Sequence, residues 1–147
     1  MVIALASDHR GYKQKEKIKA ILERFGHTLR DFGTSSEAST DYPEFAFKAV
    51  EAVSRGDCER AILTCYTGIG MSIAANKVNG IRAALCYDDE CIELSRAHNN
   101  ANVLVLPAKL DFGERLPGMI QNWIELPFEG GRHQRRLEKV SRYESGK

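Results

Sequence analysis

Two kinds of apolar pattern alternate along the chain. Short and nearly continuous apolar runs, such as residues 2–7, are typical of strands that are buried on both faces of a sheet. Between these runs apolar side chains recur at helical spacing, as Ile18, Ile21 and Leu22 do within residues 12–25. The pattern predicts strands at residues 2–7, 28–32, 60–64, 81–86 and 102–106, and helices at residues 12–25, 45–54, 73–77, 90–97, 112–123 and 132–143.

The regular alternation of strands and helices predicts an α/β fold. Parallel strands need crossover connections, and right-handed crossovers place helices on both faces of the sheet. We therefore expect residues 1–147 to form a single three-layer α/β/α Rossmann-like domain with a five-stranded parallel sheet. In such sheets ligands bind beyond the carboxyl ends of the strands, which directs attention to residues 7–9, 65–72 and 87–88.

Composition narrows the class of protein. The 147 residues are 28% charged with a net charge of +1, so no nucleic-acid or membrane partner is expected from charge. No apolar stretch is as long as a transmembrane helix, and the first residues resemble a strand rather than a secretory signal. The four cysteines lack paired spacing, which indicates free thiols and a cytoplasmic location.

The most informative segment is residues 65–72, between a predicted strand and a predicted helix. Cys65 ends the strand, and Gly68 and Gly70 expose backbone N–H groups where the helix dipole favours an anion. A thiolate base or nucleophile beside an anion hole is a catalytic arrangement. In the ordinary alternative Cys65 merely ends a strand, the glycines form a tight turn and Ser72 caps the helix. The spacing matches neither the dinucleotide fingerprint nor a P-loop.

Other polar residues offer acid–base or phosphate chemistry, although each has an ordinary structural explanation. Asp8 beside His9 is either a helix cap or a hydrogen-bonding couple for a polar substrate. His98 follows a predicted helix, where the helix dipole favours a histidine that is also a good acid–base group. Arg132 and Arg136 share one helix face after two glycines, either as a solvated basic tail or as a clamp for phosphate.

Several longer motifs follow one another in a definite order. They are Ser7-Asp8-His9, Asp31-Phe32-Gly33-Thr34, Asp41-Tyr42-Pro43, residues 65–77, Gly80-Ile81-Arg82-Ala83, residues 95–102 and Gly130-Gly131-Arg132-His133. Together they resemble the type B ribose-5-phosphate isomerase family over nearly the whole chain. The same superfamily contains the galactose-6-phosphate isomerase subunits and the allose-6-phosphate isomerases.

The resemblance implies an aldose–ketose isomerase that acts through an enediolate without a metal or another cofactor. In this family the residue matching Cys65 moves the proton between two carbons, and the loop matching residues 66–70 holds the oxyanion. The residue matching His98 assists ring opening, with those matching Asp8 and Thr67 nearby. The resemblance assigns substrate or phosphate binding to His9, Tyr42, Tyr66, Gly68, Ile69, Gly70, Ser72, Asn99, Lys109, Arg132, His133 and Arg136.

The resemblance also implies a substrate and an assembly. The default reaction converts ribose 5-phosphate to ribulose 5-phosphate in the pentose phosphate pathway. The family's sites are shared within a homodimer, with the residues matching His98 and Asn99 contributed by the partner subunit, and a tetramer is a pair of such dimers. The basic helix at about residues 130–143 is expected to complete the site.

Three residues depart from the family pattern and bear on the substrate. Tyr66 stands where glycine is usual, so it either strains the loop or adds a wall to the site. Lys109 replaces a phosphate-binding arginine, and Arg10 replaces a small residue beside His9. Two alternatives therefore stay open, namely the same chemistry on allose, galactose or tetrose phosphate, and a non-catalytic sugar-phosphate binding module. A cysteine phosphatase is disfavoured because Met71 occupies the position of its essential arginine.

Overall fold

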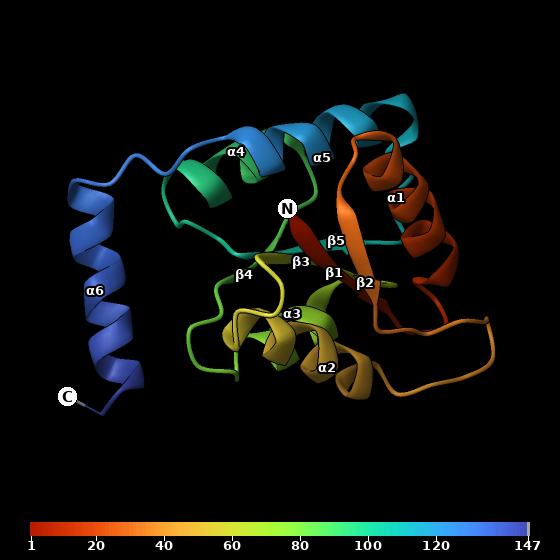
Figure 1. The fold of residues 1–147 in the computed structure, drawn as a ribbon, viewed down its shortest axis with the longest axis horizontal. Coiled ribbons are helices and arrows are strands. Elements are labelled where there is room, and N and C mark those ends of the chain that lie inside the picture. Colours follow the sequence, from red (N-terminus) through yellow and green to blue (C-terminus); the bar gives the residue numbers. More distant parts are fainter. Residues whose placement is uncertain (147) are drawn as a thin grey trace.

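Five parallel strands form one sheet in the order β2-β1-β3-β5-β4 (Figure 1). The computed structural model describes residues 1–146. The three central strands are buried almost throughout, which explains their nearly continuous apolar sequences. The strands are β1 (Val2–Ser7), β2 (Thr28–Asp31), β3 (Arg60–Cys65), β4 (Ala83–Leu85) and β5 (Val103–Pro107).

Two layers of helices cover the faces of the sheet, so the predicted α/β/α class is confirmed (Figure 1). One face packs against α1 (Tyr12–Arg24), α4 (Asp89–Ala97) and α5 (Leu116–Glu125) around the fully buried Trp123. The other face packs against α2 (Tyr42–Ser54) and α3 (Ile69–Ala75), whose small buried alanines allow close approach. The remaining elements are the 3-10 turn η1 (Gly113–Arg115) and α6 (Arg132–Glu144).

The sheet changes its direction of winding between β1 and β3. The chain leaves β1 through α1 on one face and leaves β3 through α3 on the opposite face. Adjacent loops that diverge in this way open a crevice beyond the carboxyl ends of their strands. The segments that follow Ser7 and Cys65 therefore flank the position where such a sheet binds a ligand.

Some predicted boundaries were wrong because local side chains replace regular backbone pairing. The strand predicted at residues 81–86 is shortened because Arg82 N donates to Asn102 Oδ1 and Ala83 N donates to Asn76 Oδ1. The helix predicted at residues 73–77 begins earlier, at Ile69. The helix predicted at residues 45–54 begins earlier, at Tyr42, with Pro43 in its first turn. The single helix predicted at residues 112–123 is instead the short turn η1 followed by α5.

An ion pair between the buried Lys15 and the partly exposed Asp31 joins α1 to the end of β2. Lys15 Nζ lies 2.6 Å from Asp31 Oδ2, and the Lys15 side chain is almost completely buried. Burial opposes the charge of Lys15, but hydrogen bonds with Asp31 and Glu16 outweigh it and raise the pKa of Lys15. Asp31 Oδ1 also accepts a hydrogen bond from Gly33 N, so one carboxylate holds both the helix and the loop after β2.

The last helix, α6, stands apart from the α/β body beyond β4 (Figure 1). Neither hydrophobic core contains a residue of α6, and His133 is its one buried side chain. Its apolar residue Val140 is 57% exposed. The stability of α6 therefore does not come from packing into the core of its own chain.

Candidate active site

Cys65 ends the central strand β3 at the carboxyl edge of the sheet, where the strands finish. Its backbone is opposite Pro107 of β5, and its carbonyl accepts a hydrogen bond from Ala108 N at 2.9 Å. The residue is only 5% exposed. The thiol is thus attached to a rigid part of the backbone at the position where this fold binds ligands.

The turn after Cys65 leads directly into α3. Gly68 forms the N-cap with φ of +77°, a conformation that favours glycine, and an added side chain here would collide with Leu85. The first bond of the helix runs from Ser72 N to the Gly68 carbonyl at 3.0 Å. The N–H groups of Gly70 and Met71 precede that bond and lack an intrahelical partner, whereas Ile69 N donates to Thr67 Oγ1. Ser72 lies inside α3, so its predicted capping role was wrong.

Tyr42 covers one side of this turn. Its ring lies so close to Gly70 that a side chain there would come within 2.7 Å of the Tyr42 Cζ atom. On the other side of the turn, Thr67 Oγ1 accepts a hydrogen bond from Ile69 N at 3.3 Å. The turn is therefore held by Tyr42 of α2 and by the hydrogen bond from Ile69 of α3 to Thr67.

Tyr66 does not strain the loop, and its ring contacts Arg10. Among residues 1–146 the one non-glycine residue with a positive φ is Asn100, so Tyr66 has an ordinary backbone conformation. The guanidinium carbon of Arg10 lies 3.4 Å from the centroid of the Tyr66 ring, a cation–π contact. Two departures from the family pattern thus contact each other. Arg10 and Lys109 also line a cavity of about 310 Å³ next to this pair.

Asp8 and His9 stand on the neighbouring loop after β1. Asp8 is buried, and its Oδ1 accepts a hydrogen bond from Gly11 N at 2.9 Å. The Nδ1 atom of His9 accepts from Thr40 N at 3.2 Å, which leaves Nε2 as the ring nitrogen that faces other partners. Gly11 and Thr40 were not predicted, because a glycine before a helix and a threonine in a polar loop carry no distinctive sequence signal.

The remaining cysteines are poor candidates for the base. Burial raises the pKa of Cys58 and raises that of Cys86 to about 12. Burial also raises the pKa of Cys91, which lies in the first turn of α4. All three thiols are therefore protonated at neutral pH.

The predicted site residues divide between two edges of the sheet. The carboxyl edge brings together Asp8, His9, Tyr42, Cys65, Tyr66, Thr67, Gly68, Ile69, Gly70, Ser72 and Lys109. The amino edge, where the strands begin, and the nearby α6 carry His98, Asn99, Arg132, His133 and Arg136. Strand β5 separates the two edges by about 13 Å. Within one chain, the structure does not bring the second group to Cys65.

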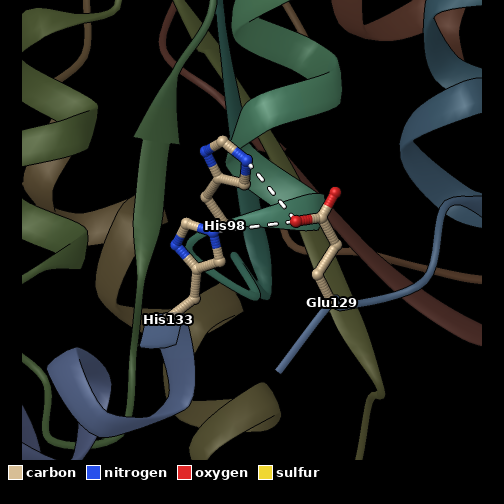
Figure 2. Close-up of side chains that lie close together, drawn as sticks. All are labelled: His98, Glu129 and His133. Atoms are coloured by element: carbon tan, nitrogen blue, oxygen red, sulfur yellow. Dashed lines mark ion pairs between the residues drawn. The ribbon is translucent and has the colours of Figure 1, made fainter. Parts of the chain in front are cut away.

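Three side chains meet at the amino edge (Figure 2). His98 is the C-cap of α4, and its Nε2 lies 3.7 Å from Glu129 Oε2. His133 Nε2 lies 3.6 Å from the same oxygen, and the two imidazole rings stack with centroids 4.0 Å apart. Burial lowers the pKa of His133, and the charges of His98 and nearby arginines lower it further. Glu129 was not predicted, although an acid four residues before His133 was visible in the sequence.

Comparison with known proteins places this geometry in a family. A model of the ribose/galactose isomerase family matches residues 3–140. The chain belongs to this family. It is 41% identical to ribose-5-phosphate isomerase B of Escherichia coli, over 97% of this chain and 95% of that protein. It is 38% identical to D-erythrulose-4-phosphate isomerase of Pectobacterium atrosepticum, over 97% and 94%. The structure of ribose-5-phosphate isomerase B from Clostridium thermocellum superposes with a TM-score of 0.96 at 42% identity, covering 99% of both chains.

Family membership confirms the predicted resemblance and the predicted enzyme class. The chain is a sugar phosphate isomerase of the type B ribose-5-phosphate isomerase family. The non-catalytic module considered as an alternative is therefore set aside. Within residues 1–146, no helix has the length and apolar character needed to cross a bilayer.

Proposed function

We propose that this isomerase interconverts ribose 5-phosphate and ribulose 5-phosphate, with Cys65 as the base. The observation that carries the proposal is the position of the Cys65 thiol. It stands buried at the tip of a central strand, next to a turn whose N–H groups are directed to the ligand side. The E. coli relative named as ribose-5-phosphate isomerase B supports the choice of substrate.

The proposed chemistry moves one hydrogen between adjacent carbons. The Cys65 thiolate removes the C2 proton of the open-chain aldose, and the negative charge moves onto the carbonyl oxygen O1 to give an enediolate. N–H groups of the turn at residues 66–70 stabilise this oxygen. The Cys65 thiol then protonates C1 while a hydroxyl proton passes from O2 to O1, which yields the ketose.

Ring opening and phosphate binding need groups that one chain keeps at its other edge. We propose that a second copy of the chain supplies His98 and Asn99 to the Cys65 edge, together with Arg132 and Arg136 on α6. The exposed apolar face of α6 supports this arrangement, because Val140 lacks a place in either core. The assembly is then a homodimer with shared sites, or a tetramer made of two such dimers.

The same chemistry on a different sugar phosphate is the second candidate function. The Arg10–Tyr66 stack favours it, because a bulky pair beside Cys65 changes the shape available to the substrate. The P. atrosepticum relative named as an isomerase of a tetrose phosphate supports this alternative. A panel of ribose, allose, galactose and erythrose phosphates separates the two, since the proposal requires ribose 5-phosphate to have the highest kcat/KM.

The test of the base is Cys65→Ala, with Cys91→Ala as the matched control. Loss of the base should lower kcat by about 100- to 10,000-fold, while the control should keep wild-type turnover. Circular dichroism checks that both variants fold. Normal turnover by Cys65→Ala would rule out the assigned base. Wild-type protein that converts none of the panel would overturn the proposed function.

A further inference from the structure

One buried nitrogen at the amino edge lacks a hydrogen-bond partner. His133 is 6% exposed, and its Nε2 atom is shielded from solvent without a partner among residues 1–146. The nearest carboxylate oxygen, Glu129 Oε2, is 3.6 Å away, which is too long for a hydrogen bond. An unsatisfied buried polar atom of this kind calls for a ligand or a functional explanation.

Side chains of the types that bind metals surround this nitrogen (Figure 2). One imidazole nitrogen of His98, one carboxylate oxygen of Glu129 and one imidazole nitrogen of His133 all lie within 4.8 Å of one another. Zinc binds imidazole nitrogen and carboxylate oxygen at about 2.0–2.2 Å, so tetrahedral ligands stand about 3.3 Å apart. The two distances to Glu129, 3.7 and 3.6 Å, are only slightly longer. The imidazole rings stack with an interplanar angle of 10°, so their Nε2 lone pairs run nearly parallel, and the rings must turn about their Cβ–Cγ bonds before both can point at one ion.

The backbone holds the three residues at one corner of the molecule. His98 N donates to the Leu94 carbonyl at the end of α4, and Glu129 N donates to the Ala97 carbonyl at 3.0 Å. His133 follows Glu129 by four residues across the turn that begins α6. The backbone therefore brings the three side chains to one place, while the 57% exposure of the Glu129 side chain leaves a route for an ion to enter.

We propose that His98, Glu129 and His133 form a binding site for Zn²⁺. Two imidazoles with one carboxylate are a known set of zinc ligands, and they leave the fourth position open for water. Mg²⁺ and Ca²⁺ prefer sets made of oxygen atoms, so the two imidazoles select a transition metal. The site lies outside the Cys65 turn of the same chain.

Zinc at this site inhibits the enzyme rather than assisting it. Coordination occupies the Nε2 lone pair of His98, which can then no longer accept or return a proton during ring opening. This consequence depends on the proposed function of His98, whereas the binding site itself does not. Zinc should therefore act as a reversible inhibitor that a chelator removes.

Equilibrium dialysis of Zn²⁺ against the metal-free full-length protein tests the site. The informative variant is Glu129→Gln, and Glu138→Gln on α6 makes the same change of charge elsewhere as a control. We expect Glu129→Gln to lower zinc affinity by about tenfold or more. The control should bind like wild type. Repeating both measurements in a Cys65→Ala background removes any contribution of that thiol.

Inhibition provides the second readout. With the rate of each variant expressed relative to its own metal-free rate, Glu129→Gln should need about tenfold or more zinc for half-inhibition than Glu138→Gln. Equal zinc affinity in Glu129→Gln and Glu138→Gln would overturn the site. If no variant has isomerase activity at all, the proposed function fails, and dialysis alone still decides the zinc site.

Discussion

The two edges of the sheet carry their polar residues in different ways. At the carboxyl edge, Asp8, His9 and the turn after Cys65 are held by hydrogen bonds and packing from both helical layers. At the amino edge, His98 and His133 belong to the end of α4 and to α6, which lies outside both cores. The contacts that hold the residues of the carboxyl edge all come from the same chain. The amino edge belongs to the part of the chain that we propose contributes to the site of another copy.

Complementation between two inactive variants gives the largest expected effect. Cys65→Ala and His98→Asn should each be inactive as purified homodimers. Co-expressed with different tags and purified as the mixed dimer, they should regain about half of wild-type activity, because one of the two shared sites contains both native residues. A coupled assay of ribulose 5-phosphate formation measures the recovery.

The control for complementation uses two residues from the same edge. A mixed dimer of Cys65→Ala and Asp8→Asn should stay inactive, since each chain then lacks one group of its own carboxyl edge. Failure of the Cys65→Ala and His98→Asn pair to recover, with a mixed dimer demonstrably present, would show that the site does not draw on both edges in this way.

A stability measurement sharpens the contrast between the regions. Asp31→Asn leaves the buried Lys15 without its main partner and should lower the free energy of unfolding by about 2–4 kcal/mol, somewhat less than for a fully buried pair because Asp31 is partly exposed. Glu138→Gln on the exposed α6 should change it by less than about 0.5 kcal/mol. Urea unfolding of both variants, followed by circular dichroism at fixed protein concentration, measures the difference.

The ion pair also predicts a dependence on pH. Although burial opposes ionisation of Asp31, hydrogen bonds from Lys15 and Gly33 lower its pKa. Its contribution to stability is therefore complete above the ordinary carboxyl pKa of about 3.9 and is lost as the pH falls through the lower native value. The difference between wild type and Asp31→Asn should shrink in acid. A difference that stays constant down to pH 2 would exclude the pair as its cause.

The sequence predicts the fold well because burial leaves a periodic signal. Strands β1, β3 and β5 are mostly apolar since both of their faces are covered, and the order of elements follows. The ends of strands are harder to predict where a side chain, rather than a neighbouring strand, forms the hydrogen bond with a backbone N–H group. Asn76 and Asn102, for example, bind the backbone that precedes β4. No period in the sequence marks such contacts.

The candidate site is predicted less completely. The glycines of residues 68–70 and the thiol of Cys65 are adjacent in sequence, so local chemistry identifies that turn. The stack of Arg10 on Tyr66 and the meeting of His98 with Glu129 join segments that are distant in the chain. Only the folded chain brings these groups together, because neither contact is fixed by helical or strand spacing.

The Arg10–Tyr66 stack provides the smallest predicted effect and tests whether the carboxyl edge also sets specificity. A cation–π contact at a partly exposed site contributes about 0.5–1 kcal/mol, a two- to fivefold change in kcat/KM if it shapes the bound state. Arg10→Ala and Tyr66→Gly should each shift the ratio of kcat/KM for ribose 5-phosphate over erythrose 4-phosphate. The double variant should shift it by less than the sum, because both changes remove one contact. Tyr66→Phe keeps the ring and should behave like wild type, whereas fully additive shifts would show that the two residues act separately.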